Sequence, residues 1–364
     1  MSHAKLDESQ KSVGVITFFN YCNYGAALQC YGLYETLRRM GHKVEYIDYT
    51  CPFIGNPFGL DSLRKRGLIR YVYTVAGNLF YRPRRRLFKT FRELIPHTEG
   101  IGPSDLPSYA NNYDRYITGS DQVWNVKLTD FDKSYFLDFV AESKKKLSYA
   151  ASFGGDNIDE TRRDEYATLL GDFEAMSVRE DYGKRIVQEL VAREPAITLD
   201  PTLLLRHEDW NALASDPVDK KPYIFVYQMG FSNTLIRAAR KLKKKTGLKL
   251  HYVPFPLGVP VAGRYHLRLG PKEWLALIRD ARYIVTDSYH GVVFALLFEK
   301  KFAVVAGGQH KNKRVISLLT RLGLQDRIID DELIDIDANI DYEHVKELLE
   351  ADRQDSIAWL KNNV

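Results

Sequence analysis

The 364-residue sequence lacks the features that mark membrane and secreted proteins. No uncharged apolar run approaches the ~20 residues that are needed to span a bilayer. Residues 1–11, MSHAKLDESQK, contain no apolar core of a signal peptide. The chain also has no repeats of short period and no low-complexity tracts. From these absences we expect a globular protein that stays in the cytoplasm.

Cysteine is scarce, and the three cysteines, Cys22, Cys30 and Cys51, do not have the spacing of a zinc site. Free thiols suit a reducing compartment. Histidine, cysteine and aspartate do not cluster with metal-ligand spacing anywhere in the sequence. We therefore predict no metal ion.

Acidic residues are absent from the segment 62–92, which carries ten lysines and arginines. Because the whole chain has a net charge of +5, the remaining residues together carry −5. Tyrosine, phenylalanine and leucine alternate with the basic residues, a pattern that suits an anionic lipid surface or a polyanionic ligand. The alternative is a solvated pair of helices whose aromatic residues fill the core. No recognisable nucleic-acid module accompanies the segment, so we predict no nucleic-acid partner.

What the sequence does contain is the composition of an ordinary globular protein, 45% hydrophobic and 27% charged residues. Its length favours two domains. The stretch 283–298 reads as a buried strand, Tyr283–Val285, a polar turn, and a helix, Val292–Phe298. In an open α/β sheet such turns line the ligand crevice, and free N–H groups at the helix N-terminus favour anions. His290 falls in this turn; the alternative is that Asp287 or Ser288 caps the helix and His290 is structural.

The N-terminal part opens with a β-α-β unit: strand Val13–Phe19, helix Ala26–Met40 and strand Lys43–Tyr49. The loop 20–25 has the length to cradle a ligand, but it is not GxGxxG, which argues against a dinucleotide site. Within this region Asn23 either contacts the ligand or caps the helix. Gln29 lies one turn further in and points either at the crevice or at the surface.

Three further polar groups follow predicted strands. Asp121 lies in Gly119–Asn125 after a strand, where a carboxylate suits acid–base work or the binding of sugar hydroxyls. Arg179 ends another strand and can clamp a carboxylate or phosphate, or else form a surface salt bridge with a glutamate. The loop Gly307–Arg314 is cationic and is either part of the crevice or a solvated face.

Together these segments resemble the polysaccharide pyruvyl transferase family. The motifs that carry the resemblance span about residues 13–325 and are Asn23-Tyr-Gly-Ala-Ala-Leu-Gln29, Gly119-Ser-Asp-Gln-Val-Trp124, Ser177-Val-Arg-Glu180, Leu199-Asp-Pro-Thr202, Asp287-Ser-Tyr-His-Gly291 and Asn312-Lys-Arg314. Each motif is weak alone, and the six in this order make the match specific.

The resemblance implies an α/β fold of the GT-B type, in which two Rossmann-like domains face a central cleft and the C-terminal helix crosses back to the first domain. We expect an N-terminal domain at 1–205 with the basic insert 62–92 on the acceptor and membrane side. We expect a donor domain at 206–340 and a C-terminal helix at 341–364.

The resemblance also implies site residues. The expected catalytic residues are His290 and Asp121. The residues expected to bind phosphoenolpyruvate are Arg179, Ser288, Gly291 and a basic residue that is either Arg314 or Lys313. The residues expected to bind the acceptor are Asn23, Tyr24, Gln29 and Trp124. Phosphoenolpyruvate enters as a co-substrate, and no cofactor is expected.

The function implied is transfer of pyruvyl from phosphoenolpyruvate to two hydroxyls of a saccharide, forming a ketal during capsule or surface-polysaccharide synthesis. The expected acceptor is linked to an isoprenoid pyrophosphate at the inner face of the cytoplasmic membrane, which would make the enzyme a peripheral membrane protein. Two alternatives remain: a GT-B glycosyltransferase that uses a nucleotide sugar, and a non-catalytic module of polysaccharide assembly. Fold alone does not separate them.

Overall fold

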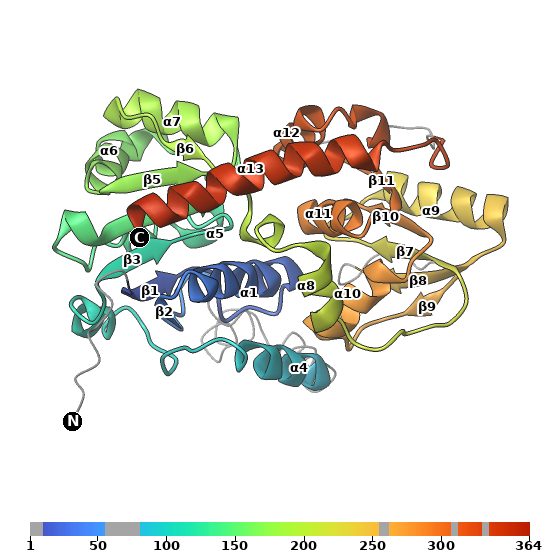
Figure 1. Ribbon diagram of the computed structural model, residues 1–364, viewed down its shortest axis with the longest axis horizontal. Helices are drawn as coiled ribbons and strands as arrows, with labels where there is room; N and C mark the ends of the chain where they lie inside the picture. Colours follow the sequence, from blue (N-terminus) through green and yellow to red (C-terminus); the bar gives the residue numbers. More distant parts are fainter. Residues whose placement is uncertain (1–9, 55–80, 255–261, 307–311, 330–334) are drawn as a thin grey trace, which may run out of the picture. The chain divides into compact units, whose positions relative to one another are not determined.

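The computed structural model describes residues 10–54, 81–254, 262–306, 312–329 and 335–364 (Figure 1). The chain divides into two compact units, and each is described by itself. Unit 1 comprises the described residues within 1–82, 89–204 and 352–364, and unit 2 those within 83–88 and 205–351. Residues 62–80 of the basic segment lie outside the described residues.

Among its described residues, unit 1 contains a six-stranded sheet in which every pairing is parallel, in the order β2-β1-β3-β4-β5-β6. The strands are β1 (Ser12–Ile16), β2 (Lys43–Tyr46), β3 (Arg115–Thr118), β4 (Lys146–Ala151), β5 (Ala175–Val178) and β6 (Ala196–Ile197). The α-helices of unit 1 are α1 (Tyr24–Arg39), α5 (Val126–Thr129), α6 (Arg163–Gly171) and α7 (Asp181–Val191). Helix α4 (Arg82–Arg92) has its residues 83–88 in unit 2 and its other residues in unit 1. Strand β4 is buried at all six positions, as expected for a parallel strand covered on both faces.

Unit 2 has, in its described part, a five-stranded parallel sheet in the order β11-β10-β7-β8-β9. Its strands are β7 (Tyr223–Tyr227), β8 (Lys249–Val253), β9 (Arg264–Tyr265), β10 (Tyr283–Thr286) and β11 (Lys301–Val304). Its helices are α8 (His207–Leu213), α9 (Asn233–Thr246), α10 (Pro271–Arg279), α11 (Tyr289–Leu297) and α12 (Lys313–Arg321). The chain steps outward from β7 on one side and then from β10 on the other, which is the Rossmann arrangement. The predicted α/β class with Rossmann-like units is therefore confirmed.

Local sequence signals fix where the helices begin and end. The Asn23 side chain accepts a hydrogen bond from the backbone N–H of Ala26 and caps α1. Ser232 caps α9 in the same way, through the N–H of Leu235. The residue that follows α9, Gly247, has a φ of +69°, the left-handed conformation that closes many helices.

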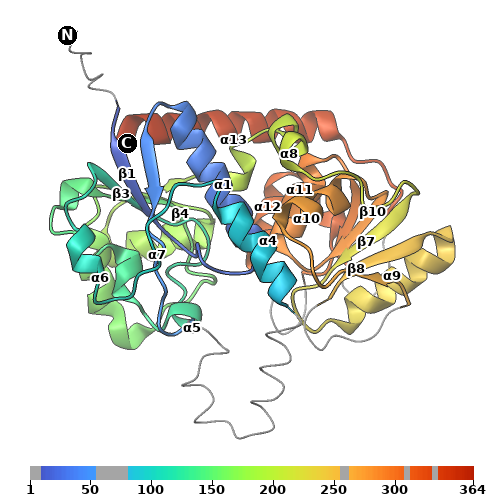
Figure 2. The same ribbon diagram turned by 90° about the horizontal axis from the view of Figure 1, so that it is seen from below.

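The C-terminal helix α13 (Tyr342–Asn363) belongs to both units: its residues from Asp352 onward are part of unit 1. There the backbone N–H of Leu199 donates to Ser356, and Arg353 donates to the carbonyl of Leu203. The C-terminus lies near β1 and β3 (Figures 1 and 2). The predicted return of this helix to the first domain is confirmed. None of the described helices is both long and apolar enough to cross a membrane.

Candidate active site

In unit 2 the chain reverses its direction of travel across the sheet between β7 and β10, so the loops after these two strands lie at the switch point where open α/β sheets bind ligands. The Asp287 carboxylate joins the two loops. One oxygen accepts from the N–H of Met229 at 2.6 Å and the other from the N–H of Gly230 at 3.1 Å. The Gln228 side chain also donates to the Gly230 carbonyl. Three hydrogen bonds therefore fasten the loop after β7.

Burial raises the pKa of Asp287 to about 6, although the two backbone N–H groups that it accepts act in the opposite direction. Asp287 is thus a carboxyl group that holds its proton to a higher pH than an ordinary aspartate does. Its protonation would weaken two hydrogen bonds that hold the loop after β7.

Helix α11 begins at Tyr289, three residues before the predicted start at Val292. Ser288 is the N-cap, and its hydroxyl accepts from the N–H of Gly291. The predicted turn therefore becomes the first turn of the helix. The Ser288 hydroxyl therefore has a structural role in capping the helix, and its contact with the donor stays a prediction.

Gly291 was expected to bind phosphoenolpyruvate, and the structure shows that packing also requires a glycine at this position. A Cβ atom at this position would lie 2.6 Å from the Thr286 hydroxyl and 3.0 Å from its methyl group. Only glycine allows the first turn of α11 to pack this closely on the end of β10. Gly291 is thus a packing residue, and its contact with phosphoenolpyruvate stays a prediction.

His290 lies in the first turn of α11 and is 7% exposed. Its ring stands nearly perpendicular to that of Tyr289, with the two ring centres 5.2 Å apart. The imidazole therefore has a defined orientation next to the helix N-terminus.

Helix α12 brings the second set of predicted residues to the same edge. Asn312 caps this helix and also donates from its side chain to the carbonyl of Asp287 at 3.1 Å. Lys313 and Arg314 open the helix, and the Arg314 guanidinium lies over the Tyr289 ring at 5.6 Å from its centre. The N-termini of α11 and α12 are thus joined, and residues 307–311 of the predicted cationic loop lie outside the described residues.

In unit 1 the carboxyl ends of the strands carry a buried ionic cluster centred on Arg179, whose side chain is 2% exposed. The guanidinium donates from Nε to Glu180 at 2.8 Å and from Nη1 to Asp200 at 2.6 Å. Asp121 lies 3.9 Å from Nη2. We define the Arg179 cluster as these four residues. The predicted alternative, a surface salt bridge with a glutamate, is half right: Arg179 pairs with Glu180, but the pair is buried.

Asp121 is the member of the Arg179 cluster that reaches solvent most, with 12% of its side chain exposed. It has a φ of +70°, and its carboxylate accepts from the N–H of the next residue, Gln122. Aspartate tolerates the left-handed region better than most residues because its side chain bonds the local backbone in this way.

The residues expected to bind an acceptor are mostly enclosed by the fold. Asn23 caps α1, while Tyr24 and Gln29 are buried in that helix. The Gln29 amide donates to the hydroxyl of Thr17 at 3.4 Å. Neither predicted position for Gln29, the open crevice or the surface, therefore describes where its side chain lies.

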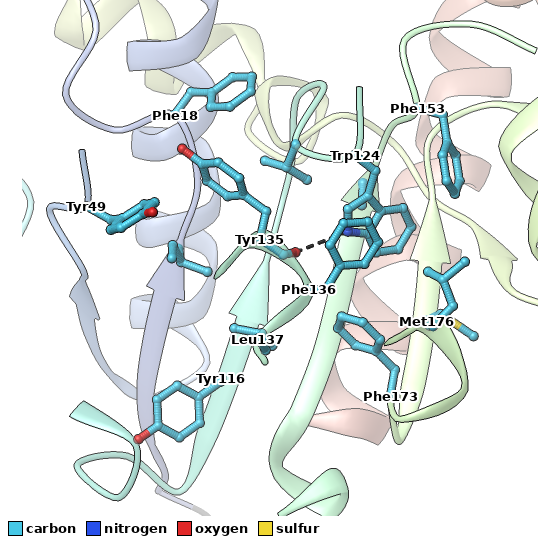
Figure 3. Close-up of a cluster of buried hydrophobic side chains, with 14 of the residues drawn as sticks. Phe18, Tyr49, Tyr116, Trp124, Tyr135, Phe136, Leu137, Phe153, Phe173 and Met176 are labelled. Carbon is cyan, nitrogen blue, oxygen red and sulfur yellow. Dashed lines mark hydrogen bonds between the residues drawn. The ribbon is translucent and has the colours of Figure 1, made fainter. Parts of the chain in front are cut away.

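Trp124 is a core residue, 1% exposed. Its indole stacks on Phe136 with ring centres 5.6 Å apart, and its N–H donates to the carbonyl of Tyr135 (Figure 3). A side chain enclosed in this way cannot stack on a sugar, so its predicted acceptor contact is not carried forward.

Two observations concern sites elsewhere. A cavity of about 540 Å³ lies beside β5, β6 and α13 in unit 1 and is lined by none of the predicted site residues. Within the described ranges, no group of three or more histidine, cysteine, aspartate or glutamate side chains could hold a metal ion.

The sequence assigned no role to Asp200 and did not specify that the glutamate partner of Arg179 is Glu180. It also did not reveal that Asp287 holds the loop after β7 or that Asn312 connects α12 to the start of α11. Asp200 and Asn312 each stand at a helix N-cap, where a short polar side chain is expected in any case. Because an N-cap already explains these residues locally, the sequence does not reveal their long-range contacts. Asp200 contacts Arg179, 21 positions away, and Asn312 contacts Asp287, 25 positions away.

A family model described as polysaccharide pyruvyl transferase matches residues 23–309. No curated protein sequence matches the chain.

Solved structures with similar folds have little sequence identity to the chain. UDP-GlcNAc 2-epimerase from Methanocaldococcus jannaschii is 10% identical with a TM-score of 0.51, covering 94% of this chain and 92% of that one. A Staphylococcus aureus structure, MnaA with UDP, is 11% identical with a TM-score of 0.51, covering 93% and 87%. At this identity the likeness concerns the fold, which is of the GT-B type as expected.

The raised pKa of Asp287 predicts a pH dependence of stability. Its folded-state value of about 6 exceeds the ordinary value, so the folded state holds the proton more tightly and the free energy of unfolding falls as pH rises from 4 to 6. The rise of the pKa from 3.8 to about 6 corresponds to a loss of about 3 kcal/mol in the free energy of unfolding across the full titration of this group. Asp287→Asn should lose this fall, measured by urea unfolding at pH 4, 5, 6 and 7.

The comparison with wild type isolates Asp287 from other groups. Burial lowers the pKa of His266 to about 4, which adds the opposite trend, a gain of stability as pH rises from 4 to 6.5. His266 is present in both proteins, so its contribution cancels in the difference. Parallel curves for the two proteins would contradict the prediction.

Proposed function

The chain belongs to the polysaccharide pyruvyl transferase family, and from this membership we propose that it transfers pyruvyl from phosphoenolpyruvate to two hydroxyls of a saccharide, forming a ketal. The choice of donor rests on the residues at the edge of the unit 2 sheet where the strands end, which we call its carboxyl edge. There Lys313 and Arg314 open α12, and the Asn312 side chain ties that helix to the start of α11. Phosphoenolpyruvate carries roughly three negative charges, and helix N-termini with adjacent cations are suited to anions.

A nucleotide-sugar glycosyltransferase is the competing function on the same fold. The structures reported above bind UDP or act on UDP-GlcNAc by their names, but their low identity supports the fold alone. A compact cationic edge is sufficient for phosphoenolpyruvate, whereas a nucleotide also needs a pocket for its base and ribose. Binding measurements with both ligands separate the two functions.

The proposed reaction requires one protonation, two attacks by hydroxyl groups and the loss of phosphate. A proton adds to the methylene carbon of phosphoenolpyruvate and makes C2 electrophilic. One sugar hydroxyl attacks C2 and loses its proton, and the C2–O bond to phosphate breaks. The second hydroxyl then attacks C2 and loses its proton, so one hydroxyl proton resides in the new methyl group and the other leaves with phosphate. An imidazole can give and take protons near neutral pH, which supports His290 in this role.

The carboxyl edge of unit 1 suits the saccharide better than the donor. The Arg179 cluster contains one cation and three carboxylates, and carboxylates accept hydrogen bonds from hydroxyl groups. Asp121 is the most accessible of the three, which supports it as the group that accepts a hydroxyl proton. Arg179 as a donor contact remains a proposal from the resemblance, and in the cluster its charge is already matched by Glu180 and Asp200.

The basic segment provides a proposed route to a lipid-linked acceptor. Arg82, Arg85, Arg86 and Lys89 are exposed on one face of α4, while Phe88 and Phe91 are buried on the other side. We call these four residues the α4 basic face. An isoprenoid pyrophosphate lies at an anionic membrane surface, where each engaged basic side chain contributes about 1 kcal/mol.

The donor assignment predicts the effect of neutralising the cations. Lys313→Ala and Arg314→Ala, made separately, should show which of the two binds phosphoenolpyruvate, because the residue that does so loses a charged hydrogen bond of about 1.5–3 kcal/mol. Isothermal titration of phosphoenolpyruvate measures this, with Lys244→Ala on α9 as the control. Unchanged affinity in both variants, or tight binding of a UDP-sugar instead, would overturn the donor assignment.

The role of His290 predicts a loss of turnover with intact binding. His290→Asn should lower phosphate release from phosphoenolpyruvate by ~10²-fold or more in the presence of a lipid-linked oligosaccharide, while donor affinity and melting temperature stay near wild type. Mass spectrometry of the oligosaccharide reports the added pyruvyl group. His207→Asn, at an exposed position, is the control. Full activity of the His290 variant would leave the histidine a structural role only.

The α4 basic face predicts salt-sensitive binding to anionic vesicles. Changing Arg82, Arg86 and Lys89 to Glu should abolish co-sedimentation with vesicles of phosphatidylglycerol and phosphatidylcholine, whereas neutral vesicles should bind neither protein. Binding should fall with added salt because the surface field decays within ~8 Å at physiological ionic strength.

The matched control reverses three exposed basic residues on one face of α9, namely Arg237, Lys241 and Lys244. This control should sediment like wild type. If the α4 variant and wild type sediment equally, the α4 basic face does not bind membranes and is an ordinary solvent-exposed surface.

A further inference from the structure

The segment Leu199–Thr202 is one of the motifs that carry the family resemblance, yet it has no role in the reaction proposed above. It follows β6 and leads into the 3-10 helix η5 (Pro201–Leu203). Its charged member, Asp200, is completely buried. A buried carboxylate is costly unless it is paired and hydrogen-bonded, so its contacts indicate what it does.

One oxygen of Asp200 is fixed by its own turn. Oδ1 accepts from the backbone N–H of Thr202 at 3.0 Å and from the Thr202 hydroxyl at 2.6 Å. Helix α1 in turn packs against η5, where a Cβ at Gly32 would lie 2.4 Å from the Pro201 carbonyl oxygen. The position of the Asp200 carboxylate is therefore fixed by the backbone of its own turn and by the close packing of α1. The carboxylate has little freedom to move with the side chain that it binds.

The other oxygen holds Arg179. Oδ2 accepts from Nη1 of Arg179 at 2.6 Å, while Glu180 accepts from Nε at 2.8 Å. The guanidinium is planar and rigid, so two carboxylates on two of its nitrogens determine the plane and the direction of the whole group. The remaining terminal nitrogen, Nη2, is then placed 3.9 Å from Asp121.

We propose that Asp200 is a positioning residue of the active site, which fixes the Arg179 guanidinium so that Nη2 faces Asp121. This inference extends the proposed function. Its predicted effects on kinetics rest on that function, whereas the contact between Asp200 and Arg179 does not. A buried ion pair adds little to the stability of a protein by itself. The contacts of Asp200, with one oxygen fixed by its own turn and the other bound to Arg179, are better explained by a role in orienting the Arg179 guanidinium. Asp200 acts through Arg179 and need not touch the substrate.

A double-mutant cycle tests this coupling. Asp200→Asn keeps the size of the side chain and an acceptor for Thr202, but it removes the charge opposite Arg179. Asp200→Asn and Arg179→Lys should each lower kcat/KM by about 10-fold or more and should affect the same parameter, either phosphoenolpyruvate affinity or kcat. The double variant should be no worse than the stronger single variant, because the two residues act as one unit. Multiplying effects, or effects on different parameters, would overturn the proposal.

A second readout needs no substrate. In protein labelled with ¹⁵N-arginine, the Nε–H resonance of Arg179 is identified by its absence from Arg179→Lys. In Asp200→Asn its exchange with water should speed up by about 10-fold or more, because the hydrogen bonds that order the guanidinium no longer act together. Unchanged exchange would overturn the proposal even if the activity falls. If wild type does not bind phosphoenolpyruvate, the proposed donor fails while this readout still decides the role of Asp200.

Two controls complete the design. Asp172→Asn removes another carboxylate of unit 1, which pairs with Lys146 at the start of β4, and should alter neither readout. If Asp200→Asn does not fold, Thr202→Val replaces it: this variant loses one hydrogen bond to Asp200 and should give a smaller change of the same kind. The effect of Thr202→Val should also vanish in the Arg179→Lys background, and its persistence there would overturn the proposal.

Discussion

In the described part of both sheets every strand pairing is parallel, and this constraint determines where chemistry can occur. All strands of a parallel sheet end at the same edge, so the loop after each strand and the start of the next helix meet there. Residues far apart in sequence, such as Arg179 and Asp200 or Asp287 and Asn312, come together for this reason.

The two edges differ in electrostatic character, and this difference organises the proposed function. The edge of unit 2 combines two linked helix N-termini with Lys313 and Arg314, an environment that favours anions. The edge of unit 1 places one arginine among three carboxylates, an environment that favours hydroxyl groups and cations. The unit 2 edge thus suits a donor with several negative charges, and the unit 1 edge suits an acceptor with many hydroxyl groups.

Each edge is held by one carboxylate with ties on both oxygens. Asp287 links the loops after β7 and β10 through two backbone N–H groups, and Asp200 links its own turn to Arg179. Burial of such groups is unfavourable unless every lone pair finds a donor, which makes the surrounding loops intolerant of rearrangement. Precise loop geometry is useful where a proton must pass between fixed atoms, since small displacements cost much of the rate.

The sequence by itself determined the α/β architecture with Rossmann-like units, because this follows from hydrophobic periodicity. It offered Asn23 and Ser288 as N-caps among other possibilities, because capping depends on hydrogen bonds within a few residues. It placed His290, Lys313 and Arg314 at strand ends through the same periodicity. Only the tertiary structure decided that Trp124 and Gln29 face the core, that Gly291 is small in order to pack on Thr286, and that Arg179 is held by Asp200. Those outcomes depend on which distant residues the sheet brings into contact, and a local pattern contains no record of such contacts.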